Sequence, residues 1–326
     1  MIFKHTNEFG QRFTIDKDDK NLVANRDLRV VEVNVITMNL VFHLVLILIS
    51  TCCCNCIKLL ILLTNPGRSH FYVFKPLVIE LNRRGHNITM VAHFSSGLSE
   101  SNSYRELILK DENKEAVHIF DLEKNMPNLN KNRKDLVLRI RERSFIQCNS
   151  SLSQDVMRNL IAEKDQYDLI LLEYFSNDCF FGFIDKFRIP VVGLSTTSIL
   201  PWHNDRFGNI ENPSYIPNAF SNFNTKMNFW DRMSNLFFVE LYKYHYDTYI
   251  SKVNEYFAEK FFNSKIAFKK DFITNYSSLM LVNTHYSLNI ARPLVPSVIE
   301  VGGIHIGMPE KLPKVCIYEY LVHNFL

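Results

Sequence analysis

A histidine in the first turn of the chain's α/β region is the strongest candidate for chemistry. Residues 65–70 read NPGRSH and connect an apolar run to a helical pattern, which places His70 at a helix N-terminus. The helix dipole disfavours a charged imidazolium there, so the ring stays neutral and able to accept a proton. A histidine in this position is also often a cap or a core residue. The turn has one glycine and no G-x-G-x-x-G or G-K-[ST] pattern, which argues against a dinucleotide site or a P-loop.

Two carboxylates follow a second apolar run. Glu173 ends the stretch 167–173, and Asp178 lies five positions further on. In open α/β sheets, ligands bind outside the carboxyl ends of the strands, so both acids are candidates to approach His70. A carboxylate on one imidazole nitrogen fixes the tautomer and stabilises the imidazolium that forms on proton uptake. Asp178 can instead cap the following helix, and Glu173 can instead be a buried structural acid.

Alternating strands and helices must position these groups. We predict a strand over 57–63, a helix over 70–84 that Gly85 ends, and a second strand over 87–93. Phe74, Leu77, Val78 and Leu81 share one face of that helix. Helical periodicity returns at 136–145 and 152–162.

The second half of the pattern continues this alternation. It contains a central strand over 167–173, a helix over 178–187 and a strand over 190–194, followed by an aromatic-rich insertion over 200–275 with a helical stretch at 229–262. A last strand is predicted at 278–283. We therefore expect a Rossmann-like parallel sheet flanked by helices in an α/β domain over 57–290, followed by a Pro- and Gly-rich linker over 291–314.

The stretch 40–63 is almost free of charge, and Lys58 is the exception. One interpretation is a single membrane-spanning helix, which needs roughly 20 apolar residues. We favour a signal peptide over 38–56 followed by a buried strand, because a short apolar core before small residues is typical of a cleavable signal. Residues 1–37 are then a non-native or disordered extension, and Met38 a plausible start.

Composition and cysteine use narrow the class of protein. The formal net charge of +3 over 326 residues and the mixed charges of 139–143 do not indicate a nucleic-acid binder. Cys52, Cys53, Cys54 and Cys56 lack His or Asp partners nearby, so we expect no metal site. Cys148 and Cys179 form either a disulfide or two separate buried thiols. The sequons at Asn149 and Asn275 are candidate glycosylation sites, whereas the one at Asn87 falls in a predicted buried strand.

Several separated blocks resemble one enzyme family, and the resemblance runs from about Ile57 to Pro313. The most specific blocks are 66–71 (PGRSHF), 81–86 (LNRRGH), 177–180 (NDCF), 201–209 (PWHNDRFGN), 212–217 (NPSYIP), 292–296 (RPLVP) and 300–305 (EVGGIH). With these blocks, the chain is similar to the N-terminal half of insect UDP-glycosyltransferases, which conjugate small lipophilic molecules.

The resemblance implies a GT-B architecture, in which this half binds the acceptor and the other half binds the UDP-sugar. His70 matches the family's catalytic base, and the displacement inverts the anomeric carbon without a metal. Asp178 is our choice for its partner acid, with Glu173 as the alternate. Aromatic residues of the insertion either line an apolar acceptor pocket or belong to the hydrophobic core; they include Phe223, Phe229 and Trp230. The resemblance also implies that the protein is located in the lumen of the endoplasmic reticulum.

The tail differs from the family. Residues 315–326 match none of it, whereas the family continues into a UDP-sugar-binding domain and a membrane helix. We therefore expect no cofactor to be bound by this half, no transferase activity from this chain alone, and a UDP-sugar only in a full-length parent. The alternative is a non-catalytic short isoform that binds lipophiles or pairs with full-length enzymes as a regulator.

Overall fold

A computed structural model describes residues 4–6, 12–14, 56–110, 133–175, 177–265 and 270–307. The chain divides into two units, Met1–Asn55 and Cys56–Leu326. In the first unit, β1 (Lys4–Thr6) pairs antiparallel with β2 (Arg12–Thr14). The predicted signal peptide, except for Cys56, and the predicted tail lie outside the described residues.

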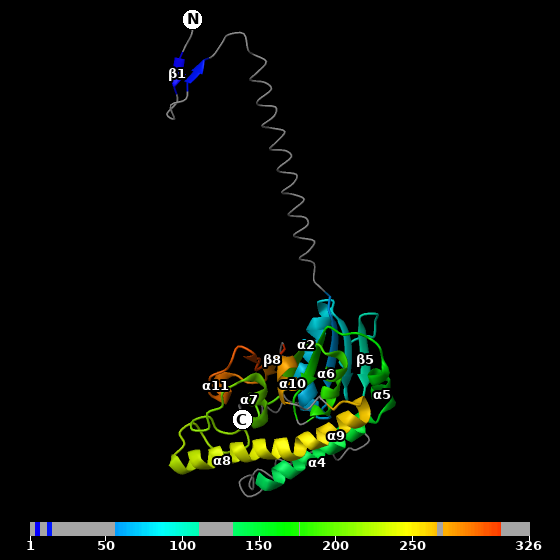
Figure 1. The fold of residues 1–326 in the computed structure, drawn as a ribbon, viewed down its shortest axis with the longest axis vertical. Coiled ribbons are helices and arrows are strands. Elements are labelled where there is room, and N and C mark those ends of the chain that lie inside the picture. Colours follow the sequence, from blue (N-terminus) through cyan, green and yellow to red (C-terminus); the bar gives the residue numbers. More distant parts are fainter. Residues whose placement is uncertain are drawn as a thin grey trace, which may run out of the picture. The chain divides into compact units, whose positions relative to one another are not determined.

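The second unit is built on a seven-stranded sheet whose strands are all parallel (Figure 1). Its spatial order is β5-β4-β3-β6-β7-β8-β9. β3, the first strand of this unit in the sequence, lies inside the sheet. β4 and β5 follow on one side of it, and β6 is then added on its other side. This reversal confirms the predicted α/β class and places a switch point between β3 and β6, where such sheets bind ligands. The strands are β3 (Lys58–Leu63), β4 (Asn87–Ala92), β5 (Tyr104–Ile108), β6 (Leu169–Glu173), β7 (Val191–Ser195), β8 (Ser277–Val282) and β9 (Val298–Glu300).

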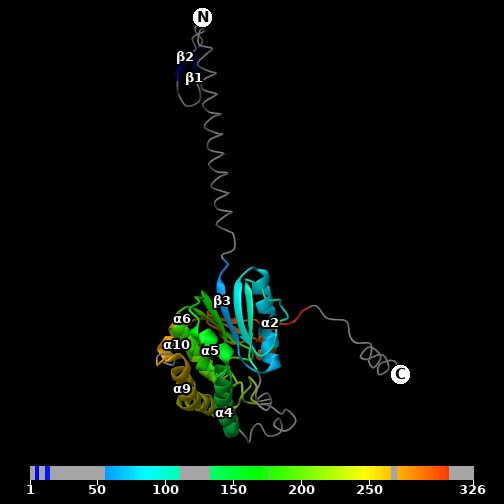
Figure 2. The same ribbon diagram turned by 90° about the vertical axis from the view of Figure 1, so that its right-hand side faces the viewer.

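Helices cover both faces of the sheet (Figure 2). Leu59 and Ile61 of β3 pack towards α2 (Arg68–Arg83), whereas Leu60 and Leu62 pack into a second core with α4, α5 and α6. Because side chains alternate along a strand, β3 is buried on both faces, which explains its continuous apolar run. Besides α2 and the long helical stretch described below, the described helices are α4 (Arg133–Leu152), α5 (Asp155–Ala162), η3 (Asp178–Phe181), α6 (Gly182–Phe187), α7 (Pro201–Phe207), α10 (Lys270–Tyr276) and α11 (Tyr286–Asn289).

The structure describes the second part of the apolar stretch 40–63, from residue 56 onwards. Lys58–Leu63 form β3, so the predicted buried strand is confirmed and a single membrane helix that extends to Leu63 is excluded. The signal peptide before this strand stays a prediction. Within the described part of the chain, no helix has the length and apolar character needed to span a bilayer.

The helical stretch predicted over 229–262 is confirmed as three consecutive segments. They are α8 (Phe229–His245), a π-helical turn η4 (Tyr246–Ile250) and α9 (Ser251–Phe262). Asn228 and Asp231 form a reciprocal capping box at the start of α8, with Asp231 N donating to Asn228 Oδ1 over 3.0 Å. The cap fixes where the long helix begins.

Two strands were missed, and both lie at sheet edges. β5 contains the charged residues Arg105 and Glu106. An edge strand is partly exposed to solvent, so its apolar pattern is weak. β9 has three residues and lies inside the segment predicted as a linker, yet it pairs with β8. The strand predicted to be last, β8, is therefore followed by another. Because prolines lie on both sides of β9, the sequence around it has no strand-like periodicity.

Cys148 and Cys179 form a disulfide, which is one of the two alternatives predicted for them. Both cysteines are fully buried. The bond joins α4 to η3, the short helix that follows the carboxyl end of β6. It therefore ties the helical layer to the loop beside the candidate site.

Removing this disulfide should lower the free energy of unfolding substantially. The two cysteines are separated by 31 residues, and a closed loop of that length contributes about 3–4 kcal/mol by restricting the unfolded chain. Urea unfolding of the Cys148→Ala/Cys179→Ala double variant measures the loss. Cys56, an exposed free cysteine, gives the control, because Cys56→Ala should leave stability unchanged. A loss no larger in the double variant than in this control would contradict the prediction.

Candidate active site at the sheet's switch point

The turn after β3 brings His70 to the switch point of the sheet. Thr64, Asn65 and Pro66 are buried, and Gly67 is the N-cap of α2. Gly67 N donates to Asn65 Oδ1 over 2.9 Å, and Gly67 O accepts from His70 N over 3.1 Å. A Cβ at position 67 would lie 3.1 Å from both Asn65 Oδ1 and His70 Cδ2. The single glycine of the turn thus lets the imidazole pack directly against the loop.

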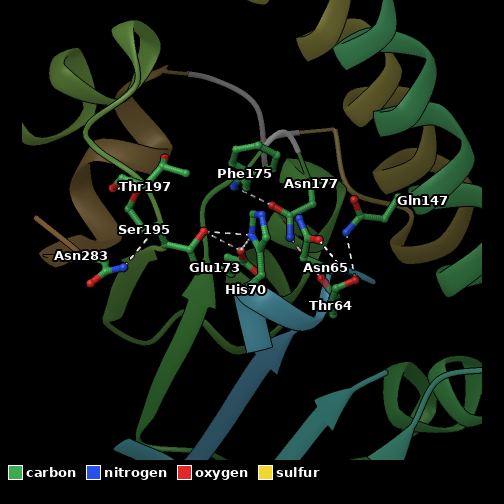
Figure 3. A network of polar contacts seen from close by, with 12 residues as sticks. Thr64, Asn65, His70, Gln147, Glu173, Phe175, Asn177, Ser195, Thr197 and Asn283 are labelled. Atoms are coloured by element: carbon green, nitrogen blue, oxygen red, sulfur yellow. Dashed lines mark hydrogen bonds and ion pairs between the residues drawn. The ribbon is translucent and has the colours of Figure 1, made fainter. Parts of the chain in front are cut away.

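Among the residues that the structure describes, the imidazole of His70 makes hydrogen bonds through one of its two nitrogens. Its Nδ1 donates to Oε1 of Glu173 (Figure 3). The same nitrogen lies 2.9 Å from Oγ1 of Thr196. The Glu173 side chain is 1% exposed and that of His70 is 16% exposed. Because an ionised carboxylate only accepts hydrogen bonds, Nδ1 carries the proton and Nε2 is the basic nitrogen. Within the described ranges, no hydrogen bond to Nε2 is found.

An aromatic ring and a polar network hold the surrounding loops. Phe175 meets the His70 ring edge-on, with 4.7 Å between centroids. At the end of β3, the backbone oxygen of Thr64 accepts from Gln147 Nε2 over 2.9 Å, and its hydroxyl accepts from Asn177 Nδ2 over 3.1 Å. Figure 3 shows these side chains gathered around His70. Loops after β3 and β6 are thereby fixed to each other and to α4.

Asp178 does not contact His70, which corrects our first choice for the partner acid. It is buried, pairs with the guanidinium of Arg206, and accepts a hydrogen bond from the Tyr246 hydroxyl. Burial raises the pKa of Asp178, and the charge of Arg206 opposes that rise. The physical reason for the correction is position. Glu173 is the last residue of β6, beside the end of β3, whereas η3 turns Asp178 towards α7 and η4.

Asp178 also does not cap the helix that follows. It is the first residue of η3, and the N-cap position belongs to Asn177, which makes no side-chain capping bond. Arg206 Nη2 additionally donates to Tyr246 Oη over 2.9 Å. The guanidinium carbon lies 5.1 to 5.5 Å from the ring centroids of Phe181, Tyr246 and Tyr174. Asp178 is thus the acid of a buried ion pair that anchors the insertion.

The predicted aromatic residues of the insertion are not gathered at His70. Phe229 and Trp230 are 65% and 75% exposed on α8. The buried aromatic cluster instead contains Trp202, Tyr242 and Tyr246, with Phe175 packed against it. Since Phe175 also contacts His70, this cluster adjoins the candidate site. A cleft of about 250 Å³ opens beside Arg206 and Trp202.

The remaining predicted sites are placed as follows. Asn149 in α4 and Asn275 in α10 are exposed, and Asn87 is half-buried at the start of β4. Exposure is compatible with glycosylation at the first two, which stays a prediction. Among the described residues, no cluster of three or more His, Cys, Asp or Glu is arranged to hold a metal ion. Thr196 and Phe175 were missed, although each lies two positions after a predicted strand, at the edge where such sheets bind ligands.

The fold and the site together define an α/β protein with a histidine–carboxylate pair at its ligand-binding edge, an arrangement typical of enzymes that remove a proton from a bound group. The chain belongs to the UDP-glucoronosyl and UDP-glucosyl transferase family, whose model matches residues 58–321. This confirms the resemblance found in the sequence.

Two relatives by sequence agree with that assignment. The chain is 33% identical over 280 residues to UDP-glucosyltransferase 2 of Dactylopius coccus, covering 84% of this chain and 52% of that protein. It is 26% identical over 262 residues to UDP-glucuronosyltransferase 3A2 of Homo sapiens, with 74% and 47% covered. A solved structure of UGT89C1 from Arabidopsis thaliana complexed with quercetin is 12% identical, with a TM-score of 0.39 and coverage of 82% and 55%. The chain spans about half the length of the curated relatives it matches.

Proposed function

We propose that this chain is the acceptor-binding half of a UDP-glycosyltransferase of GT-B architecture. The proposed reaction transfers a hexose from a UDP-sugar to a hydroxyl of a small lipophilic molecule. The observation that carries the proposal is the state of His70. Glu173 holds the proton on Nδ1, and Nε2 is left as the basic nitrogen at the edge where α/β sheets bind ligands.

In this proposal His70 is the general base. Nε2 takes the proton of the acceptor hydroxyl while that oxygen forms a bond to the anomeric carbon. The bond between the anomeric carbon and the UDP oxygen breaks, and UDP leaves with the electron pair. Attack from the side opposite to UDP inverts the anomeric carbon. The buried carboxylate of Glu173 stabilises the imidazolium that results.

The acceptor and the donor are assigned to different halves. The apolar cluster that extends from Phe175 to Trp202 offers this chain a surface for a lipophilic acceptor. The UDP-sugar belongs to the other half, so we assign no cofactor to this chain. The Cys148–Cys179 disulfide supports an oxidising compartment, which agrees with the predicted signal peptide and an endoplasmic reticulum lumen.

A chimera tests the proposal. In the completed enzyme, as we call it, residues 56–307 of this chain replace the aligned part of UDP-glucosyltransferase 2 of Dactylopius coccus. We expect it to transfer glucose from UDP-glucose to 1-naphthol with a β-glucoside as product. The 326-residue chain alone should bind 1-naphthol and transfer nothing.

Other outcomes have defined meanings. An α-glucoside would contradict single displacement, and transfer by the 326-residue chain alone would contradict the division between halves. The non-catalytic alternative, a lipophile-binding or regulatory module, is favoured if the chain binds 1-naphthol but the folded chimera transfers no glucose.

A further inference from the structure

Thr196 is a third polar group at the imidazole of His70. It directly follows β7, which ends at Ser195. Its Oγ1 lies 2.9 Å from Nδ1 of His70 and 3.5 Å from Oε1 of Glu173. One hydroxyl thus lies beside both members of the histidine–carboxylate pair.

The backbone of Thr196 is itself fixed from a neighbouring strand. Nδ2 of Asn283 donates to Thr196 O over 3.2 Å, and Asn283 N donates to Ser195 O over 2.9 Å. Asn283 directly follows β8, and Figure 3 shows it reaching across to the β7 end. The hydroxyl is therefore held in place by two strand ends rather than by a free loop.

The hydrogen-bonding capacity of a hydroxyl decides how it acts here. When Nδ1 carries the proton, its N–H is shared between Glu173 and Thr196 Oγ1, which both accept a hydrogen bond from it. The Thr196 hydroxyl then donates its own proton to Oε1 of Glu173. When Nδ1 is unprotonated, the Thr196 hydroxyl donates to Nδ1 instead. Oε1 of Glu173 then receives a hydrogen bond from neither group and faces the lone pair of Nδ1. A hydrogen bond to a charged acceptor contributes more than one to a neutral acceptor, so the hydroxyl favours the first state.

We propose that Thr196 is a positioning residue that holds His70 in the tautomer with Nε2 free. Its catalytic consequence rests on the proposed function, since the tautomer matters to transfer only if His70 is the base. The tautomer itself is a property of this chain and is measurable without any substrate.

Nuclear magnetic resonance of ¹⁵N-histidine in the folded 326-residue chain tests the proposal. We expect wild-type His70 to be protonated mainly on Nδ1. In Thr196→Val and Thr196→Ala, the ratio of the Nδ1–H to the Nε2–H form should fall roughly 2- to 10-fold, as expected for loss of one hydrogen bond. Thr196→Ser retains the hydroxyl and should retain the wild-type ratio. Thr197→Val is the matched control, because the Thr197 hydroxyl donates to Ser198 O.

Activity of the completed enzyme gives an independent measurement. Thr196→Val should lower kcat in proportion to the measured fall in the fraction of His70 that carries its proton on Nδ1. It should leave the KM for 1-naphthol unchanged and be rescued by Thr196→Ser. An unchanged tautomer ratio in both the Val and Ala variants overturns the proposal, as does an equal fall in Thr196→Ser. If the ratio shifts as expected but the completed enzyme transfers no glucose, Thr196 keeps its role and the proposed function fails.

Discussion

Replacing His70 by alanine in the completed enzyme should lower kcat about 10²- to 10⁴-fold, the range expected for loss of a general base. The acceptor must lose its proton as it attacks, and Nε2 of His70 is the acceptor that the site supplies. The affinity for 1-naphthol should change little, because the imidazole is mostly covered and contributes little apolar surface. Measured kcat and KM separate these effects. His305→Ala, at an exposed histidine of the last described segment, is the control.

The same assay decides between the two carboxylates. Glu173→Gln keeps the size of the side chain but removes the charge that holds the proton on Nδ1, so kcat should fall by a similar order to His70→Ala. Asp178→Asn should leave kcat of the folded enzyme near the wild-type value, because Asp178 bonds to Arg206 and Tyr246 instead. The opposite result, with Asp178→Asn inactive and Glu173→Gln active, would overturn the assignment.

The choice between these acids shows what a sequence leaves open. Both residues follow the same predicted strand, and the rule that ligands bind at carboxyl strand ends admits both. The decision depends on the turn after Glu173, where η3 directs Asp178 away from His70. Its new partners, Arg206 and Tyr246, come from an insertion whose path no periodicity predicts. The position of His70, in contrast, follows from the strand, the single glycine and the helix that surround it.

The sheet shows the same division. The central strands β3 and β6 are buried on both faces, so continuous apolar runs marked them clearly. The edge strands β5 and β9 face solvent on one side, and their patterns are short and broken by charge or proline. Thr196 was missed for a related reason. A lone threonine after a strand is common, and only the three-dimensional contact with Nδ1 distinguishes it.

Replacing Arg206 by methionine should destabilise the fold by about 3–5 kcal/mol, because it leaves the carboxylate of Asp178 buried without its cation. The side chains of Arg206 and Asp178 are 8% and 3% exposed, so the carboxylate loses its cation in a largely buried position. The double variant Arg206→Met/Asp178→Leu should recover much of the loss, since apolar residues often replace a buried pair without cost. Arg158→Met is the control. Arg158 pairs with Asp155 at the surface, where an ion pair contributes about 0–1 kcal/mol.

The pH dependence of the Arg206→Met deficit distinguishes a buried charge from lost packing. Burial already raises the pKa of Asp178, and removing Arg206 removes the largest influence that lowers it. A carboxyl whose pKa is higher in the folded than in the unfolded state binds its proton more readily when folded. Its destabilising effect is therefore full above the folded-state pKa and declines as the pH falls through that value. Urea unfolding at neutral and at acidic pH should show a smaller deficit at acidic pH. A deficit that stays constant with pH would mean that Arg206 acts through packing against Tyr174, Phe181 and Tyr246 rather than through its charge.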